Sequence, residues 1–199
     1  MTSATRGITA LLLLFGACTA YAQDHGYVVT ERTRAALERM TRETFRLHAG
    51  DKVPEFSVTL LDGTTVSSSD LRGKTVLINF WGTLCPPCRA ELARIESELL
   101  PALEKRAFVF LPIACEGAEA VSKCAEERGY RFVSGTDPDR TVMNLFCGPG
   151  IPRNIVVDPT GKIISAEAGY LPDRFEAMAE LIRRSVEADT GEQTTDINE

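Results

Sequence analysis

Two cysteines stand at the ends of the sequence Cys85-Pro86-Pro87-Cys88. They follow the β-branched and aromatic run Thr75 to Trp81, which predicts a buried central strand, and they precede an amphipathic helix pattern. A thiol is nucleophilic only as a thiolate, and a helix N-terminus stabilises that anion through free N–H groups and partial positive charge. We therefore expect Cys85 to be the more acidic thiol. Cys88, one turn further on, is expected to be a shielded resolving thiol within disulfide reach.

The same spacing also fits an inert structural disulfide or half of a zinc site. Zinc requires a second pair of ligands, and the spacing of Cys115 and Cys124 matches no zinc finger. The only histidines are His25 and His48, which leaves little material for a histidine-rich metal site. The position between a buried strand and a helix N-terminus favours redox chemistry at Cys85 and Cys88, without a metal or another cofactor.

The composition limits the class of protein. The chain has 199 residues, of which 44% are hydrophobic and 25% charged, and this is typical of a globular protein. Its formal net charge is −6, and Lys and Arg are scattered along the sequence, so nucleic acid is not an expected partner. No apolar run reaches the roughly 18 residues that a membrane-spanning helix needs, which excludes a polytopic membrane protein.

The first residues are typical of a secretory signal. Arg6 precedes the apolar stretch Ile8 to Ala17, and Ala20-Tyr21-Ala22 fits a cleavage site. In a second interpretation, Phe15 to Cys18 is a lipobox, and lipidation of Cys18 attaches the protein to a membrane surface. Both interpretations predict a periplasmic or otherwise exported protein, in a compartment where thiols are not held reduced.

The rest of the chain alternates between strand and helix patterns. A strand, a helix and a strand in sequence predict a parallel βαβ unit, and a later hairpin adds antiparallel strands to the same sheet. The expected elements are a helix within 23–50, a hairpin over 53–66, strands over 75–81 and 108–114, helices over 88–105 (kinked or ended by Pro101), 118–128 and near 139–146, a hairpin over 154–165 and a helix over 172–188.

These features resemble the thioredoxin-like superfamily, and within it the TlpA/ResA type of periplasmic thiol-disulfide oxidoreductases. The resemblance implies an α/β fold of three layers, with a mixed central sheet, helices on both faces and an N-terminal β-hairpin extension. The segments that carry it are Pro54-Glu55-Phe56 with Asp62-Gly63, Asn79 to Thr83, Cys85 to Leu92, and Gly150-Ile151-Pro152 leading to Ile155 to Asp158 and Gly161-Lys162.

The expected domain organisation follows from the same patterns. One thioredoxin-like domain accounts for most of the chain, and its flanks are a signal, a lead-in and a polar tail. The boundaries are 1–22 for the signal peptide (or a lipoprotein signal to Cys18), 23–50 for the helical lead-in, 51–187 for the thioredoxin-like domain and 188–199 for a disordered tail.

The resemblance also assigns roles to four further residues. It implies that Pro152 is cis and packs against the cysteine pair, and proline is the residue before which a cis bond costs least. The backbone of Ile151 is expected to pair with a substrate peptide, and Trp81 to belong to both the core and the rim of the site. Glu91 matches a carboxylate proposed to assist proton transfer, and a solvated helix position is the alternative for it.

Three residues depart from the family pattern. Asn79 stands where thioredoxin has a buried Asp, and Leu84 replaces the usual aromatic residue before the first cysteine. Arg153 follows the cis-proline position, where a small hydroxyl residue is commoner. If Arg153 points toward Cys85, its charge favours the thiolate and an acidic partner; if it points outward, it does neither.

The remaining cysteines of the main body are odd in number, so at least one is unpaired. Cys115 follows the second buried strand, at the edge of the sheet that also carries Cys85. Cys124 lies in the next helix, and a structural Cys115–Cys124 disulfide is expected, with two buried free thiols as the alternative. Cys147 is then unpaired, near the redox pair.

The expected function is an exported thiol-disulfide oxidoreductase that reduces protein disulfides and receives electrons from a membrane or periplasmic donor. One alternative is a copper-binding thioredoxin-fold metallochaperone, but such proteins space their cysteines further apart and add a downstream histidine. The other is a peroxiredoxin-like peroxidase. That class has Thr or Ser three residues before the reactive cysteine and Pro further upstream, where this chain has Gly82 and Ile78.

Overall fold

The computed structural model describes residues 29–189. The predicted signal segment with Cys18, and residues 190–199 of the predicted tail, lie outside the described residues. Within the described part, no helix is long and apolar enough to cross a membrane.

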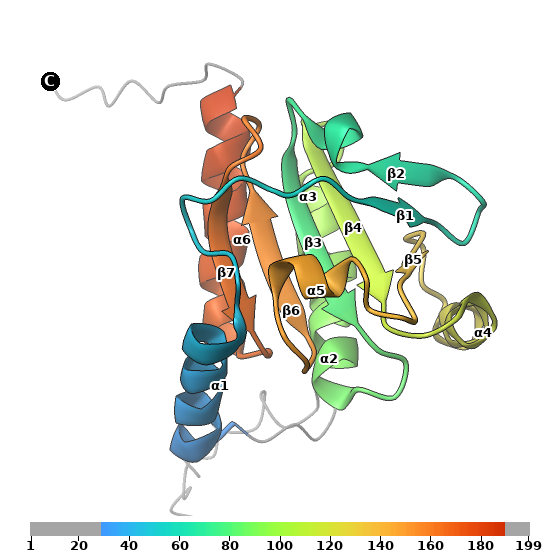
Figure 1. The fold of residues 1–199 in the computed structure, drawn as a ribbon, viewed down its shortest axis with the longest axis horizontal. Helices are drawn as coiled ribbons and strands as arrows, with labels where there is room; N and C mark the ends of the chain where they lie inside the picture. Colours follow the sequence, from blue (N-terminus) through green and yellow to red (C-terminus); the bar gives the residue numbers. More distant parts are fainter. Residues whose placement is uncertain (1–28, 190–199) are drawn as a thin grey trace, which may run out of the picture.

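A mixed sheet of five strands forms the centre, in the order β5-β4-β3-β6-β7 (Figure 1). β3 (Thr75–Trp81) pairs in parallel with β4 (Phe108–Ala114), which pairs in parallel with the short β5 (Gly135–Thr136). β6 (Arg153–Val157) runs antiparallel to both β3 and β7 (Ile163–Ala168). Every residue of β3 is buried, as its continuous apolar run predicts for a strand covered on both faces. The predicted α/β fold with a mixed sheet is confirmed.

Three helices cover one face of this sheet. They are α2 (Pro86–Arg94), α4 (Ala118–Arg128) and α6 (Pro172–Asp189). Their apolar side chains form one core with alternate residues of the sheet, including Leu77 and Val156. α4 ends as predicted at Gly129, whose left-handed φ of 68° suits glycine.

The opposite face carries the hairpin and short elements. The hairpin pairs β1 (Ser57–Thr59) with β2 (Thr65–Ser67), and η1 (Ser68–Leu71) and α5 (Met143–Phe146) follow later in the chain. A second core lies beneath them. α1 (Glu31–Thr44) lies beside the edge strand β7 in Figure 1, within the predicted lead-in.

The helix predicted over 88–105 is divided in three. α2 is followed by a π-helical turn, η2 (Ile95–Leu99), and by the short α3 (Leu100–Ala102). Pro101 lacks an N–H, and its ring crowds the carbonyl four residues earlier, so a regular turn is disfavoured there. In the wider turn the N–H of Leu100 donates to the carbonyl of Ile95 instead.

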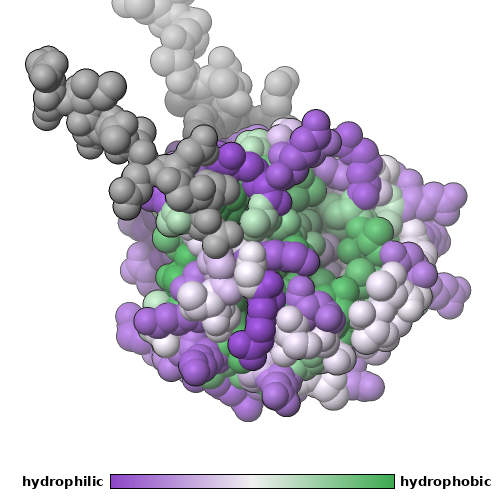
Figure 2. Space-filling view, turned by 90° about the horizontal axis from the view of Figure 1, so that it is seen from above, coloured by the Kyte–Doolittle hydropathy of each residue, from purple (hydrophilic) through white to green (hydrophobic). Residues whose placement is uncertain are grey.

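Figure 2 shows the end of the molecule away from the first turn of α2. Polar side chains form most of this surface, and apolar side chains show mainly in a groove between them.

The C-terminal ends of β3 and β4 lie together at the other end of the sheet, as parallel pairing requires, and the N–H of Cys115 donates to the carbonyl of Trp81. The loops that follow these two strands are therefore neighbours.

Candidate active site

Cys85 and Cys88 form a disulfide at the start of α2, with their Cα atoms 5.3 Å apart. Cys85 is the N-cap residue, and its Sγ accepts the N–H of Cys88 at 3.3 Å. Pro86 and Pro87 occupy the first helical positions and have no N–H, so this is the first donor that the helix presents. Cys85 is partly exposed and Cys88 is buried, so an approaching molecule reaches Cys85 first.

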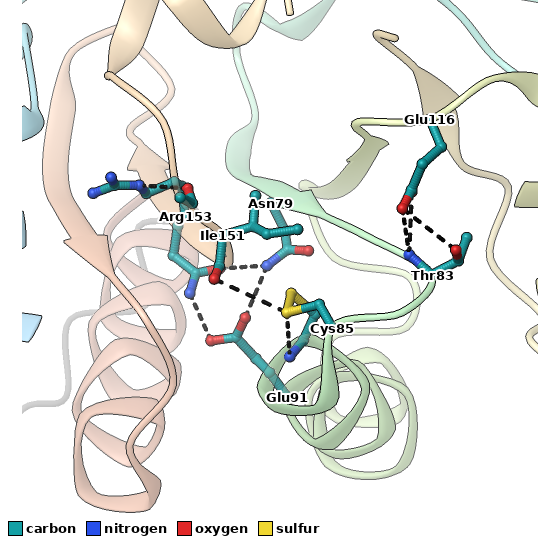
Figure 3. The surroundings of a disulfide bond; sticks show 10 residues. Asn79, Thr83, Cys85, Glu91, Glu116, Ile151 and Arg153 are labelled. Atoms are coloured by element: carbon teal, nitrogen blue, oxygen red, sulfur yellow. Dashed lines mark hydrogen bonds between the residues drawn. A yellow bond between two sulfur atoms is a disulfide. The ribbon is translucent and has the colours of Figure 1, made fainter. Parts of the chain in front are cut away.

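The loop before β6 lies against the same sulfur. The Ile151–Pro152 peptide bond is cis, which confirms that prediction. The carbonyl oxygen of Ile151 lies 3.9 Å from Cys85 Sγ (Figure 3). Ile151 is partly exposed, so its backbone is placed beside the accessible sulfur.

Glu91 lies on α2 one turn after Cys88, and its carboxyl group is buried with two asparagines. It accepts the side-chain N–H groups of Asn79 at 3.0 Å and of Asn154 at 2.6 Å. Burial raises the pKa of Glu91 to about 8, although both hydrogen bonds act to lower it, and the charge of Glu167 raises it further. The alternative of a solvated helix position for Glu91 is wrong. A carboxyl group with this pKa can exchange a proton near neutral pH.

Asn154 and Glu116 are site residues that the sequence patterns did not single out. Asn154 is a polar residue directly before the apolar run Ile155 to Val157 of β6, and this position in a buried strand is the signal that the sequence offers. Glu116 follows β4, and both of its carboxylate oxygens accept the backbone N–H of Thr83 at 3.1 Å (Figure 3). The carboxylate thus fixes the loop that leads to Cys85. The sequence signal for Glu116 is its position directly after β4, because the C-terminal ends of the parallel strands β3 and β4 lie side by side.

The sequence model of the AhpC/TSA family matches residues 49–166. The chain belongs to this family. Among its relatives is the thiol-disulfide oxidoreductase ResA of Geobacillus kaustophilus, which is 31% identical over 78% of this chain and 82% of the relative. ResA of Bacillus thuringiensis is 27% identical over 62% of this chain and 72% of the relative.

A solved structure supports the same assignment. The solution structure of a candidate protein disulfide isomerase from Bacteroides thetaiotaomicron superposes with a TM-score of 0.69 and 28% identity, covering 72% of this chain and 93% of the other. With the Cys85–Cys88 pair at the expected place in this thioredoxin-like fold, this member of the AhpC/TSA family is a thiol-disulfide oxidoreductase of the ResA type.

The rim of the site in this AhpC/TSA protein differs from the expectation. Trp81 is fully buried, and its indole N–H donates to the Ser134 hydroxyl at 3.0 Å. The prediction that Trp81 also contacts substrate at the rim is wrong, because the ring packs edge-on against Tyr130 and Phe132 inside the fold. Leu84, which is 86% exposed, is the large apolar side chain beside Cys85.

Arg153 takes neither of the two expected orientations. Its side chain is buried and points away from Cys85 (Figure 3). It donates to the carbonyl oxygens of Pro149 at 2.6 Å and Gly150 at 2.9 Å, and its guanidinium lies 5.1 Å from the centre of the Phe45 ring. Arg153 therefore holds the loop before the cis proline and does not act on the Cys85 sulfur.

The remaining cysteines of the described chain are free, and the predicted Cys115–Cys124 disulfide is absent. Cys115 lies against Met143, 3.6 Å between the sulfurs, whereas Cys124 belongs to the core on the other face of the sheet. The sheet between them prevents pairing. Cys147 is buried in the same core as Met143, and burial raises the pKa of both Cys115 and Cys147 to about 11. These two thiols stay protonated at neutral pH.

Proposed function

We propose that the protein is exported and reduces disulfide bonds of protein substrates, with Cys85 as the attacking thiol and Cys88 as the resolving thiol. The observation that carries this proposal is the contrast between the two sulfurs. Cys85 Sγ is accessible and accepts an N–H bond at the N-cap of α2, whereas Cys88 is buried behind it. The free N–H at a helix N-terminus favours a thiolate at Cys85, and burial favours the protonated thiol at Cys88.

We propose that the exchange has two steps. The Cys85 thiolate attacks one sulfur of the substrate disulfide, and a mixed disulfide forms as the first substrate thiolate leaves and takes up a proton. Cys88 then loses its proton and attacks Cys85 Sγ, which restores the Cys85–Cys88 disulfide and releases the second substrate thiol. Two electrons pass to the substrate, so a membrane or periplasmic dithiol donor must reduce the pair again.

Glu91 is proposed to take the proton of Cys88 during the second step. It lies one helical turn from Cys88, and its pKa of about 8 lets the ionised form accept a proton near neutral pH. The backbone of Ile151, beside Cys85 Sγ, is proposed to pair with the substrate chain while the mixed disulfide exists. Such pairing would align the substrate sulfurs with Cys85.

Export is proposed from residues 1–22, with lipidation at Cys18 as the alternative mode of delivery. Expression of the full chain in a bacterial host, followed by N-terminal sequencing of the extracytoplasmic fraction, tests both. A new N-terminus at Gln23 supports cleavage, and a lipid-modified Cys18 supports the anchor. Recovery of the unprocessed chain from the cytoplasm would contradict export.

The exchange mechanism is tested with the Cys88→Ser variant, which cannot resolve a mixed disulfide. Incubated with insulin, this variant is expected to accumulate an insulin adduct that is lost when Cys85 is also changed to Ser. The reduced wild-type protein, free of copper, is expected to reduce insulin. This activity distinguishes an oxidoreductase from a protein that only carries copper. A Cys88→Ser protein whose Cys85 thiol still alkylates but captures no insulin would contradict the proposal.

A further inference from the structure

A pocket of about 310 Å³ lies between α2–η2 and the end of α4 with the segment that follows it. Among its lining residues, Arg89 is the nearest to the redox pair along α2, because it follows Cys88 directly in the sequence. One helix face forms the floor, because its lining residues recur at positions i, i+4 and i+7. The main lining residues are Arg89, Ala93, Glu96, Arg128, Tyr130 and Arg131.

The pocket carries an excess of positive charge. Glu96 offsets Arg131, since its Oε1 accepts the backbone N–H of Arg131 at 2.6 Å and lies 3.7 Å from the guanidinium. Within residues 29–189, no carboxylate forms an ion pair with Arg89 or Arg128. Both arginines line the same pocket as Tyr130. Burial raises the pKa of Tyr130, and the charges of Arg128 and Arg89 oppose this rise.

The positive charge of the pocket lies within reach of a substrate chain that is bound to Cys85. Arg89 lies four residues after Cys85, slightly more than one helical turn, or about 6 Å along the axis. A chain joined to Cys85 through a mixed disulfide can therefore place a side chain a few residues from its cysteine into the pocket. The exposed Leu84, which precedes Cys85 in the sequence, offers an apolar contact to the same chain.

The arginines are distant in the sequence, and the fold brings them together. The protein as a whole has a formal net charge of −6, so an acidic partner is repelled by most of its surface. A local cationic pocket on a protein that is otherwise negative attracts the acidic group of a partner. It therefore favours the orientation of the partner that places this group in the pocket. Arg89 and Arg128 present guanidinium forks, which match carboxylate geometry.

We propose that this pocket binds an acidic segment of the protein substrate, close to the cysteine that Cys85 attacks. The inference rests on the proposed function, and it names the substrate feature that the site prefers: Asp or Glu a few residues from the disulfide. Binding there positions the substrate sulfur at Cys85 before exchange.

The test compares two disulfide-linked peptides of equal length. One carries Asp and Glu within about six residues of its cysteine, and the other carries Asn and Gln at the same places. The reduced protein is mixed with each, and the rate of disulfide reduction is followed. The quantity measured is the ratio of the two rates within each variant, because this ratio cancels any change in the reactivity of Cys85 itself.

The wild-type protein is expected to reduce the acidic peptide about fivefold faster at low salt, since two solvent-facing ion pairs each change a rate about two- to threefold. The double variant Arg89→Gln/Arg128→Gln is expected to bring the ratio close to one, and so is salt at about 1 M. The matched control Arg32→Gln/Arg39→Gln makes the same change in net charge on the exposed surface of α1, and it is expected to keep the ratio.

Three results would overturn the inference while the proposed function stands: equal rates for both peptides with the wild-type protein, a ratio that survives in the double variant, or an equal loss in the α1 control. If the reduced protein reduces neither peptide, the proposed function itself fails, and this inference fails with it. The two failures are thus distinguishable in one set of measurements.

Discussion

Replacing Glu91 by Gln tests the buried carboxyl group through the pH dependence of stability. Burial raises the pKa of Glu91 from 4.5 to about 8, so the folded protein holds this proton more tightly than the unfolded chain does. Folded-state stability is therefore lost as pH rises from about 4.5 to about 8. At about 1.4 kcal/mol per pKa unit, the loss over that window is about 5 kcal/mol at most.

The glutamine of Glu91→Gln carries no charge at any pH and escapes this loss. Its amide group has one acceptor oxygen, so it cannot accept the N–H groups of both Asn79 and Asn154 as the two carboxyl oxygens of Glu91 do. We expect the variant to be less stable than the wild-type protein near pH 5, where the neutral carboxyl fits the site, and to gain on it steadily up to pH 8.

The assay is urea unfolding of the oxidised proteins between pH 5 and 8.5, with the difference in unfolding free energy plotted against pH. Glu98→Gln is the matched control, at a position in η2 seven residues after Glu91. Arg94 lowers the pKa of Glu98, so this group stays ionised across the window and its variant should differ from wild type by a constant. Parallel wild-type and Glu91→Gln curves would refute the raised pKa of Glu91.

Gly82→Ala is expected to lower the free energy of unfolding by about 1–3 kcal/mol, because its methyl group would lie 2.6 Å from the side chain of Ile151; an unchanged urea midpoint would contradict this contact. Arg153→Met leaves two loop carbonyls without their donors and should cost a similar amount, about 1–3 kcal/mol, without shifting the pH profile of Cys85 alkylation. Leu84→Ser should leave stability within about 0.5 kcal/mol and slow the reduction of insulin more than that of a small-molecule disulfide, and equal slowing of both would contradict a docking role.

Much of the fold could be predicted because its signals are local. The continuous apolar runs of β3 and β4, with a helix between them, specify a parallel pair, and Pro86 and Pro87 mark the start of α2. The position of Cys85 and Cys88 at the strand–helix junction follows from these local patterns alone. β5 is two residues long and leaves no periodic signal, which is why the pattern missed it.

The rest of the site depends on contacts between distant segments. Asn79 and Asn154 meet Glu91 only because β3 pairs with β6 and α2 packs over both, and a linear pattern does not show that register. The Cys115–Cys124 pairing was wrong for a related reason. Closeness in sequence suggested a disulfide, whereas the two side chains lie on opposite faces of the sheet.

The most direct measurement is the rate of iodoacetamide modification of Cys85 in the reduced protein as a function of pH, followed by peptide mass spectrometry. An N-cap thiolate that accepts the Cys88 N–H predicts a midpoint below the value of about 8.5 for a free cysteine. Cys115 is the internal reference, since burial raises its pKa to about 11 and it should stay unmodified until strongly alkaline pH. A Cys85 midpoint at or above that of free cysteine would contradict its role as the attacking thiol.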